Sequence, residues 1–437
     1  MTLAGQSAVT DRAGPSHLDT VLALLLALAA FSVYRIPALR LADTQAFEVL
    51  NLAFDWDPTY FVRYLAGDSG SAVHGINFKH PLWWVFRLTA QPFIALGYPA
   101  KSAAALSMAL MGAASVAGVW VFLRRQRAPR PEAFLATLFF ASSSTVVFTS
   151  IVPESYGWSN AALVLLWTLA LARDPARPAL WIGRLLAAVL VAGATISNLM
   201  QVVIVQGAGR LAAVGPRRAL VQTLGFLAAV LLAVALVLVL TQPVDLWHAL
   251  KQPLQTAKEV SWQRTFLGDK VGLVQLLTTY FAYSFVAPEF SSVPLSSSLT
   301  MQDFRSPSYA PWSAAALAIW LVFAALQAGW MLWRSPDRRW GWALLATVVA
   351  NVAFHLDYQS RGSVYIYAAH LHFPIFALGT GALGFWAALG RWQRGLQLAV
   401  LAALVGLTAA TSLVRVQQLV EHLQQTRVSP DAPEVKP

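Results

Sequence analysis

The sequence predicts an all-α protein that crosses a membrane about eleven times, and three observations lead to this prediction. Of the 437 residues, 57% are hydrophobic and only 12% are charged, which is about half the charged share of a soluble domain. Several apolar runs reach the roughly 20 residues that a helix needs to cross a bilayer. Short arginine clusters separate these runs, as is typical of cytoplasmic loops. Backbone groups in lipid must be paired within their own segment, so we expect the runs to be helices.

The first span is predicted at residues 18–38. No small-residue cleavage site follows this run, so it is expected to stay as an anchor behind a cytoplasmic N-terminus, 1–17. Residues 18–415 would form one transmembrane domain, and residues 416–437 a polar C-terminal tail. The eleven spans are expected at about 18–38, 101–124, 133–152, 157–173, 179–196, 199–214, 219–241, 311–333, 340–356, 364–388 and 395–415.

Arginine-rich loops fix the predicted orientation in a bacterial inner membrane. They lie at 124–127, 173–177, 210–218, 334–339 and 391–394. All five fall on the cytoplasmic side only if the amphipathic run 81–96 lies along the outer, periplasmic face instead of crossing. The outer face then receives the long segments 39–100 and 242–310. The cytoplasmic loops are too short to hold a site, so function is expected at the outer face.

Composition also excludes several classes of protein. The net charge is +11, but the arginines sit between apolar runs, which favours membrane topology over nucleic-acid binding. The chain has no cysteine, which rules out disulfides, thiol nucleophiles and cysteine metal sites. No Walker, Rossmann, HExxH or GxSxG pattern is present, so nucleotide-driven transport and the common hydrolase classes lose support.

Two carboxylates just beyond the first span are the most informative residues. Asp55 and Asp57 flank Trp56, and Pro58 follows. Either carboxylate could act as a general base on an acceptor hydroxyl or amine. Asp57 before Pro58 also suits the N-cap of a helix, with the proline in its first position. An exposed loop aspartate needs no special role, so both readings stay open.

Cationic side chains follow in the same outer segment and again late in the chain. Lys79 and His80 precede the amphipathic run, whose tryptophans suit the membrane interface. These groups could neutralise a lipid phosphate, although an interfacial lysine can also simply reach toward headgroups. Arg361, in a predicted outer loop, is a second candidate for holding a phosphate.

Polar residues between later spans complete the set of candidates. Glu154 and Tyr156 lie in a short turn, where a carboxylate is usually just solvated but could bind substrate or, together with His80, a divalent cation. Asn198 and Gln201 interrupt an apolar hairpin, so they either join helices or face a cavity. His370 and His372 are two residues apart and would point to different faces of a helix, which argues against a shared metal site.

These features resemble the GT-C superfamily of glycosyltransferases, in its protein O-mannosyltransferase and aminoarabinose transferase branch. The resemblance rests on one anchor, an outer loop with acidic residues, and the segment His80, Pro81, Leu82, Trp83 and Trp84. It covers roughly residues 18–241. That family carries an adjacent acidic pair and a second proline, whereas here Trp56 separates the aspartates and Leu82 follows Pro81.

The resemblance implies transfer of a sugar from a polyprenyl-phosphate donor to an acceptor at the outer face, by an inverting mechanism. Asp55 or Asp57 would be the base, and Lys79, His80 and Arg361 would hold the lipid phosphate. Two alternatives are a transporter or flippase of lipid-linked sugars, and a non-catalytic assembly subunit. Transporters usually bury ionisable residues near the midplane and show internal repeats, whereas here the charges lie mostly at span ends and no repeat is visible.

Overall fold

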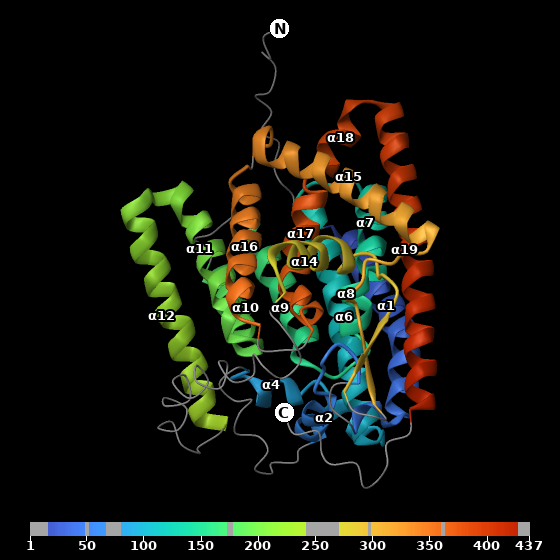
Figure 1. The fold of residues 1–437 in the computed structure, drawn as a ribbon. Coiled ribbons are helices and arrows are strands. Elements are labelled where there is room, and N and C mark those ends of the chain that lie inside the picture. The colour runs from blue at the N-terminus through green and yellow to red at the C-terminus, as the bar shows by residue number, and fades with distance from the viewer. Residues whose placement is uncertain are drawn as a thin grey trace.

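The computed structural model describes residues 16–48, 52–66, 80–172, 178–241, 271–295, 299–336, 338–359 and 363–426. Within these residues the chain is a bundle of helices with one two-stranded sheet (Figure 1), which confirms the all-α, multi-span prediction. A helix or helix pair occupies each of the eleven predicted spans. They are α1 (His17–Ala42), α6 (Ala100–Arg125), α7 (Arg130–Ser142) with α8 (Ser144–Thr149), α9 (Ser155–Ala170), α10 (Pro178–Ala194), α11 (Leu199–Val214), α12 (Pro216–Thr241), α15 (Pro311–Trp333), α16 (Arg338–Asp357), α17 (Ala368–Thr380) and α19 (Arg391–Gln425).

Six of the described helical stretches are long and apolar enough to cross a membrane by themselves. Others are shorter, such as α9 with 16 residues and α10 with 17. Most of α9 is buried, whereas the first half of α10 exposes Trp181, Ile182 and Leu186. Helix α17 belongs to one of the six long stretches, and every one of its residues is buried. By contrast, α1, α12 and α15 expose rows of large apolar side chains, as lipid-facing helices do.

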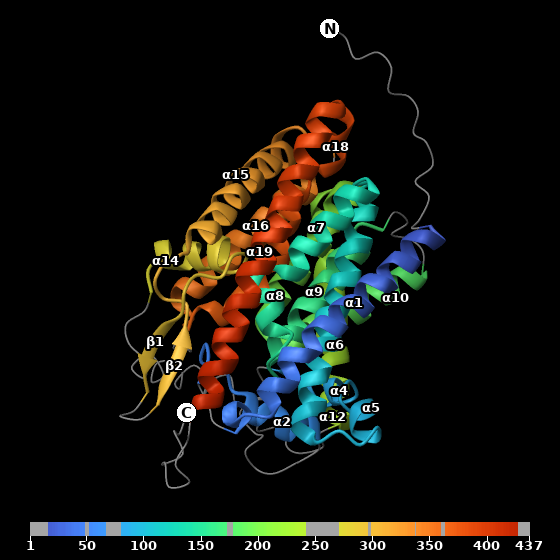
Figure 2. The same cartoon turned by 90° about the vertical axis from the view of Figure 1, so that its right-hand side faces the viewer.

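Shorter elements connect the spans and cover one end of the bundle. They are η1 (Gln45–Phe47), α2 (Pro58–Ala66), α4 (Trp83–Arg87), α5 (Gln91–Ala95), η3 (Ile196–Asn198), α14 (Leu273–Thr278), the π-helical turn η4 (Thr279–Tyr283), β1 (Ser291–Pro294), β2 (Thr300–Asp303), η5 (Tyr365–Tyr367) and α18 (Leu383–Leu389). In both views α2 and α4 lie at the end opposite α18 (Figures 1 and 2), and Figure 2 shows α5 beside them. The predicted amphipathic run 81–96 therefore forms two short helices, α4 and α5, that do not cross the bundle. The predicted hairpin at Asn198 is present, as η3 between α10 and α11.

Two spans differ from their predicted form. The predicted span 133–152 is broken at Ser143, between α7 and α8. The amides of Ser144 and Thr145 donate to the carbonyls of Phe285 and Ser284 at 3.1 and 3.0 Å, so backbone from beyond η4 satisfies the break. The last helix, α19, continues to Gln425, past the end predicted at 415. Its added turns bury Leu419 and Leu423, and both line a small apolar hollow with Phe47 and Trp56.

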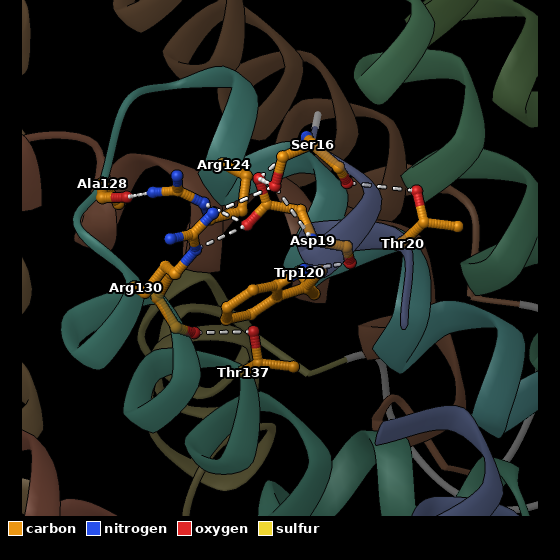
Figure 3. Close-up of polar contacts among 9 residues, drawn as sticks. Ser16, Asp19, Thr20, Trp120, Arg124, Ala128, Arg130 and Thr137 are labelled. Atoms are coloured by element: carbon orange, nitrogen blue, oxygen red, sulfur yellow. Dashed lines mark hydrogen bonds and ion pairs between the residues drawn. The ribbon is translucent and has the colours of Figure 1, made fainter. Parts of the chain in front are cut away.

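The end of the bundle that carries Arg124, Arg210, Arg339 and Arg391 is called the arginine end below. A buried carboxylate fixes α1 there (Figure 3). Asp19 accepts from the Nε atoms of Arg124 and Arg130 at 3.0 and 3.1 Å, and its carbonyl accepts from the Trp120 indole at 2.8 Å. Ser16 caps α1 through a reciprocal bond with Asp19. The start of α1 is thereby tied to α6 and α7.

Candidate functional site

The candidate site is built on the loop 52–57, which pairs with a strand distant in sequence. The Phe54 amide donates to the Gln302 carbonyl at 2.8 Å, and the Gln302 amide donates to the Leu52 carbonyl at 3.0 Å. Ala53 and Gln302 form a parallel bridge. The hairpin of β1 and β2 therefore holds the loop against the bundle, at the end opposite the arginine end (Figure 2).

Aromatic side chains anchor the same loop. The Phe54 ring lies at the centre of a buried cluster and packs against neighbours at centroid distances of 4.6 to 5.8 Å. Its neighbours are Trp56, Phe148, Phe290, Phe304 and Tyr365. The cluster joins the loop 52–57 to α8, to the residue that follows β2 and to η5. It explains why Asp55 and Asp57, on either side of Trp56, are fixed and not exposed.

The backbone at Phe54 and Asp55 is strained. Their φ angles are 50° and 59°, in the left-handed region that non-glycine residues rarely adopt, with aspartate tolerated better than phenylalanine. Such strain persists only where surrounding packing over-determines it, and it is concentrated at functional sites. The aromatic cluster and the pairing with Gln302 supply that packing here.

Three carboxylate residues meet at this loop. Asp55, Asp57 and Glu154 are 3%, 8% and 2% exposed, so Glu154 is not the solvated turn residue that was the plainer expectation. One oxygen of Glu154 accepts from the Asp57 amide at 2.8 Å. The other accepts from the Ser155 amide at 3.1 Å, which makes Glu154 the N-cap of α9. A single side chain thus connects the loop 52–57 to the start of α9.

Asp57 has the helix-starting place that its sequence predicted. Helix α2 begins at Pro58, and the Tyr60 amide donates to the Asp57 carbonyl at 3.2 Å. Asp55, two residues earlier, has no such place in a helix. Its amide lies 3.1 Å from the sulfur of Met301, next to the strand that pairs with the loop.

His80 is held against the end of α10. Its Nδ1 lies 2.6 Å from the Ala194 carbonyl oxygen. A carbonyl oxygen only accepts, so Nδ1 carries a proton, and in the neutral ring Nε2 then carries the lone pair. Nearby, the Leu82 amide donates to the Gly193 carbonyl at 3.1 Å. A Cβ on Gly193 would lie 2.1 Å from the Leu82 side chain, so this approach requires glycine.

Tyr156, Asn198 and Gln201 gather around His370, on the buried helix α17. The rings of Tyr156 and His370 are 5.4 Å apart, and the amide nitrogen of Asn198 lies 3.1 Å from His370 Nδ1. Gln201 Nε2 donates to the His370 carbonyl at 2.7 Å. The two amide side chains therefore join helices at these contacts. His372 instead faces Ser143, 2.8 Å from its hydroxyl, so the two histidines point apart as expected.

Asp303 is a buried carboxylate that the sequence did not single out. It accepts from Ser363 at 2.7 Å and from Arg305 at 2.9 Å, and it follows Gln302, which pairs with the candidate loop. Burial raises the pKa of Asp303, although these hydrogen bonds and the Arg305 charge oppose the shift. Asp303 ends a four-residue strand within a long segment between two spans. Nothing in the local sequence indicates that it is buried or that it contacts Ser363.

Two of the predicted phosphate-binding residues, Lys79 and Arg361, lie outside the described residues. Of the other predicted residues, Asp57 and Glu154 are directly bonded, and Tyr156, Asn198 and Gln201 share His370 as a neighbour. His80 lies close enough to His370 for an electrostatic interaction. Because His80 is also bonded to the Ala194 carbonyl of α10, it connects the residues around His370 to α10. All of them lie at the end of the helices opposite the arginine end.

The hydrogen-bond partners of Glu154 and His80 limit which of their atoms could bind a divalent cation. Both oxygens of Glu154 accept backbone amides, while His80 could offer Nε2 as a ligand, since its Nδ1 is bonded to a carbonyl as in many metal sites. Among the described residues no three histidine or carboxylate groups gather into a ligand set. A cation at Glu154 and His80 therefore stays a prediction, and no chemical step is assigned to it.

Comparison with known proteins shows the fold of the chain. No family model matches it, and no curated protein sequence does either. Its structure is similar to the crystal structure of ArnT from Cupriavidus metallidurans bound to undecaprenyl phosphate, with a TM-score of 0.53 and 13% identity. The match covers 93% of this chain and 77% of ArnT. The chain therefore has a membrane fold similar to that of ArnT, which agrees with the fold that the sequence resemblance implied.

Proposed function

We propose that this protein is a glycosyltransferase that moves a sugar from a polyprenyl-phosphate donor to an acceptor at the outer face of the inner membrane. The observation that carries the proposal is the gathering of Asp55, Asp57 and Glu154, buried at one end of a GT-C-type bundle. The undecaprenyl phosphate in the ArnT structure supports a lipid of that class as the donor.

The proposed reaction is a single displacement with inversion. Asp55 or Asp57 takes the proton from the acceptor hydroxyl or amine as that atom attacks the anomeric carbon. The bond from the anomeric carbon to the phosphate oxygen breaks, and polyprenyl phosphate leaves with the electron pair. Cationic groups stabilise the phosphate charge. Among the described residues the candidate is His80 in its protonated form, which would donate from Nε2, and Lys79 and Arg361 are proposed with it. Glu154 positions the loop by holding the Asp57 amide.

The proposal predicts that the purified chain cleaves the donor. Lipid extract from a strain that lacks the gene should contain the accumulated polyprenyl-phosphate sugar. Adding the chain and an envelope acceptor fraction should release free polyprenyl phosphate and transfer the sugar, both measured by mass spectrometry. A transporter or flippase would leave the bond between sugar and phosphate intact, and an assembly subunit would not change the extract. No release of polyprenyl phosphate under any acceptor condition would reject the enzyme proposal.

The proposed periplasmic orientation has its own test, because the chain contains no cysteine. Ser69 belongs to the first predicted outer segment, and Gln126 ends α6 at the arginine end. In intact cells, a membrane-impermeant maleimide is expected to label Ser69→Cys but not Gln126→Cys, and both after permeabilisation. Labelling of both in intact cells, or of Gln126→Cys alone, would contradict the orientation.

A further inference from the structure

A polar cavity lies at the arginine end, and the proposed reaction makes no use of it. Its volume is about 290 Å³, and α6, α9, α10, α11, α12 and α16 all contribute to its lining. Glu154 caps one end of α9, whereas Ala170 at the other end of this 16-residue helix lines the cavity. At 1.5 Å per residue the two sites are about 24 Å apart. The cavity is therefore separate from the candidate active site.

Four arginines line this cavity: Arg125, Arg184, Arg210 and Arg339. They come from four different helices, so the charge is assembled by the fold and does not come from one basic loop. Arg184 lies close enough to Arg125 and Arg210 for their charges to repel it. Within the described part of the chain, no carboxylate lines the cavity.

Neighbouring arginines at the same end are treated differently. Arg124 and Arg130 pair with the buried Asp19 (Figure 3), and Arg394 pairs with the buried Glu132 at 2.6 Å. Outside the cavity, therefore, the described residues include a buried carboxylate beside each of these three arginines. The cavity arginines contrast with this pattern.

A purely structural role accounts for part of the cluster. Arg125 donates to the Thr168 carbonyl, and Arg184 to those of Leu169 and Ala172 at 3.1 Å, so both cap the C-terminal end of α9. A helix C-terminus carries about half a negative charge. Among the residues that the structure describes, this leaves most of the four positive charges without a counter-charge. Among described residues, Arg210 has no hydrogen-bond or ion-pair partner, and Arg339 only stacks on Trp340, 5.4 Å from the ring centroid. Capping alone does not explain these two.

We propose that this cavity binds a phosphate-bearing anion between the four arginines. Guanidinium groups match phosphate oxygens in bidentate geometry. The rest of the lining mixes the polar side chains of Gln126, Gln206 and Ser335 with apolar ones such as Leu166, Val202 and Phe226. Basic pockets between membrane helices bind anionic lipid headgroups, and the exposed leucines of α12 show that this helix faces lipid. A phosphatidylglycerol-type headgroup is the source that this lining favours over a soluble phosphate.

The test uses the full chain in detergent with two separate probes, phosphatidylglycerol and inorganic phosphate. Phosphatidylglycerol is expected to be retained in native mass spectra and to raise the thermal unfolding midpoint, while phosphatidylcholine does neither. Each arginine near an anionic headgroup contributes about a factor of five in affinity. The double variant Arg210→Gln with Arg339→Gln should therefore bind about 25-fold more weakly.

The matched control removes two charges outside the cavity. Arg217→Gln with Arg218→Gln, in the first turn of α12, makes the same change in net charge but leaves the lining intact. This control should bind either probe like the native chain. If the double variant does not fold, the single variants Arg210→Gln and Arg339→Gln replace it in the test. Each should bind the probe about fivefold more weakly than the native chain.

A response to either probe that is lost only in the cavity variants supports the site, and the responding probe identifies the source. Equal binding by the cavity variants, the control and the native chain would overturn the proposal. So would a complete lack of response to both probes. Sugar transfer does not enter these readouts, so the result is independent of the proposed enzyme activity.

Discussion

Replacing Asp55 by asparagine is expected to reduce kcat/KM by about 10²- to 10⁴-fold, the range for removing a positioned general base. Asparagine is isosteric and tolerates the left-handed backbone that Asp55 adopts, so the loop should keep its shape. Asp57→Asn is made separately. Asp55→Asn should lower activity without lowering stability, whereas Asp57→Asn could lower both, because Asp57 directly precedes the first residue of α2. Release of polyprenyl phosphate, measured at saturating and limiting donor, is the assay.

The control for both variants is Asp43→Asn. Asp43 is an exposed aspartate at the end of α1, twelve residues before Asp55, so its replacement should leave kcat/KM and the unfolding midpoint unchanged. A loss restricted to Asp55→Asn or Asp57→Asn, with normal expression, supports catalysis at this loop. Full activity in both variants would remove the proposed base and leave the carboxylates a structural role.

Much of the fold could be predicted because the membrane simplifies its physics. Apolar length indicates the spans and arginine clusters indicate one end of each, and these two signals place a helix at every predicted span. The same signals predicted that residues 81–96 do not cross the bundle and that the chain turns near Asn198. Pro58 correctly marked the start of α2, since proline suits the first helical position.

Contacts between distant segments could not be read from the sequence. The pairing of Phe54 with Gln302 joins residues almost 250 positions apart, and the two short strands β1 and β2 have no strong alternating pattern. The break at Ser143 depends on carbonyls supplied by Ser284 and Phe285, not on a local breaker such as proline. The buried state of Glu154 follows from the same kind of long-range packing.

The candidate site was predicted by residue type more than by contact. Sidedness alone brought Asp55, Asp57 and Glu154 to one end of the predicted bundle, and Glu154 does bond the Asp57 amide. Nothing local, however, showed that His370 would be the common neighbour of Tyr156, Asn198 and Gln201. A histidine in the middle of a buried helix looks the same in sequence whether it packs or faces a site.

Replacing Glu154 by alanine is the second change with a large expected effect. It removes the acceptor for the Asp57 and Ser155 amides, both in buried surroundings. A buried unsatisfied amide costs about 1–3 kcal/mol, and loss of an N-cap about 0.5–2 kcal/mol. Displacement of the loop should lower kcat by about 10²-fold, because misplacing a catalytic group by about 1 Å has that effect. Glu154→Gln keeps one acceptor oxygen and should recover part of kcat.

The matched control for Glu154 is Glu132, which separates positioning from stability. Glu132 is also buried, but it pairs with Arg394 at the arginine end. Glu132→Ala should lower the unfolding midpoint while kcat per folded molecule stays at the native value. If Glu154 positions the base, Glu154→Ala lowers kcat well beyond this control with KM for the donor little changed. A carboxylate that merely stabilises α9 has no reason to affect the chemical step. Equal kcat for the two alanine variants, or no partial recovery in Glu154→Gln, would therefore mean that Glu154 only supports the fold.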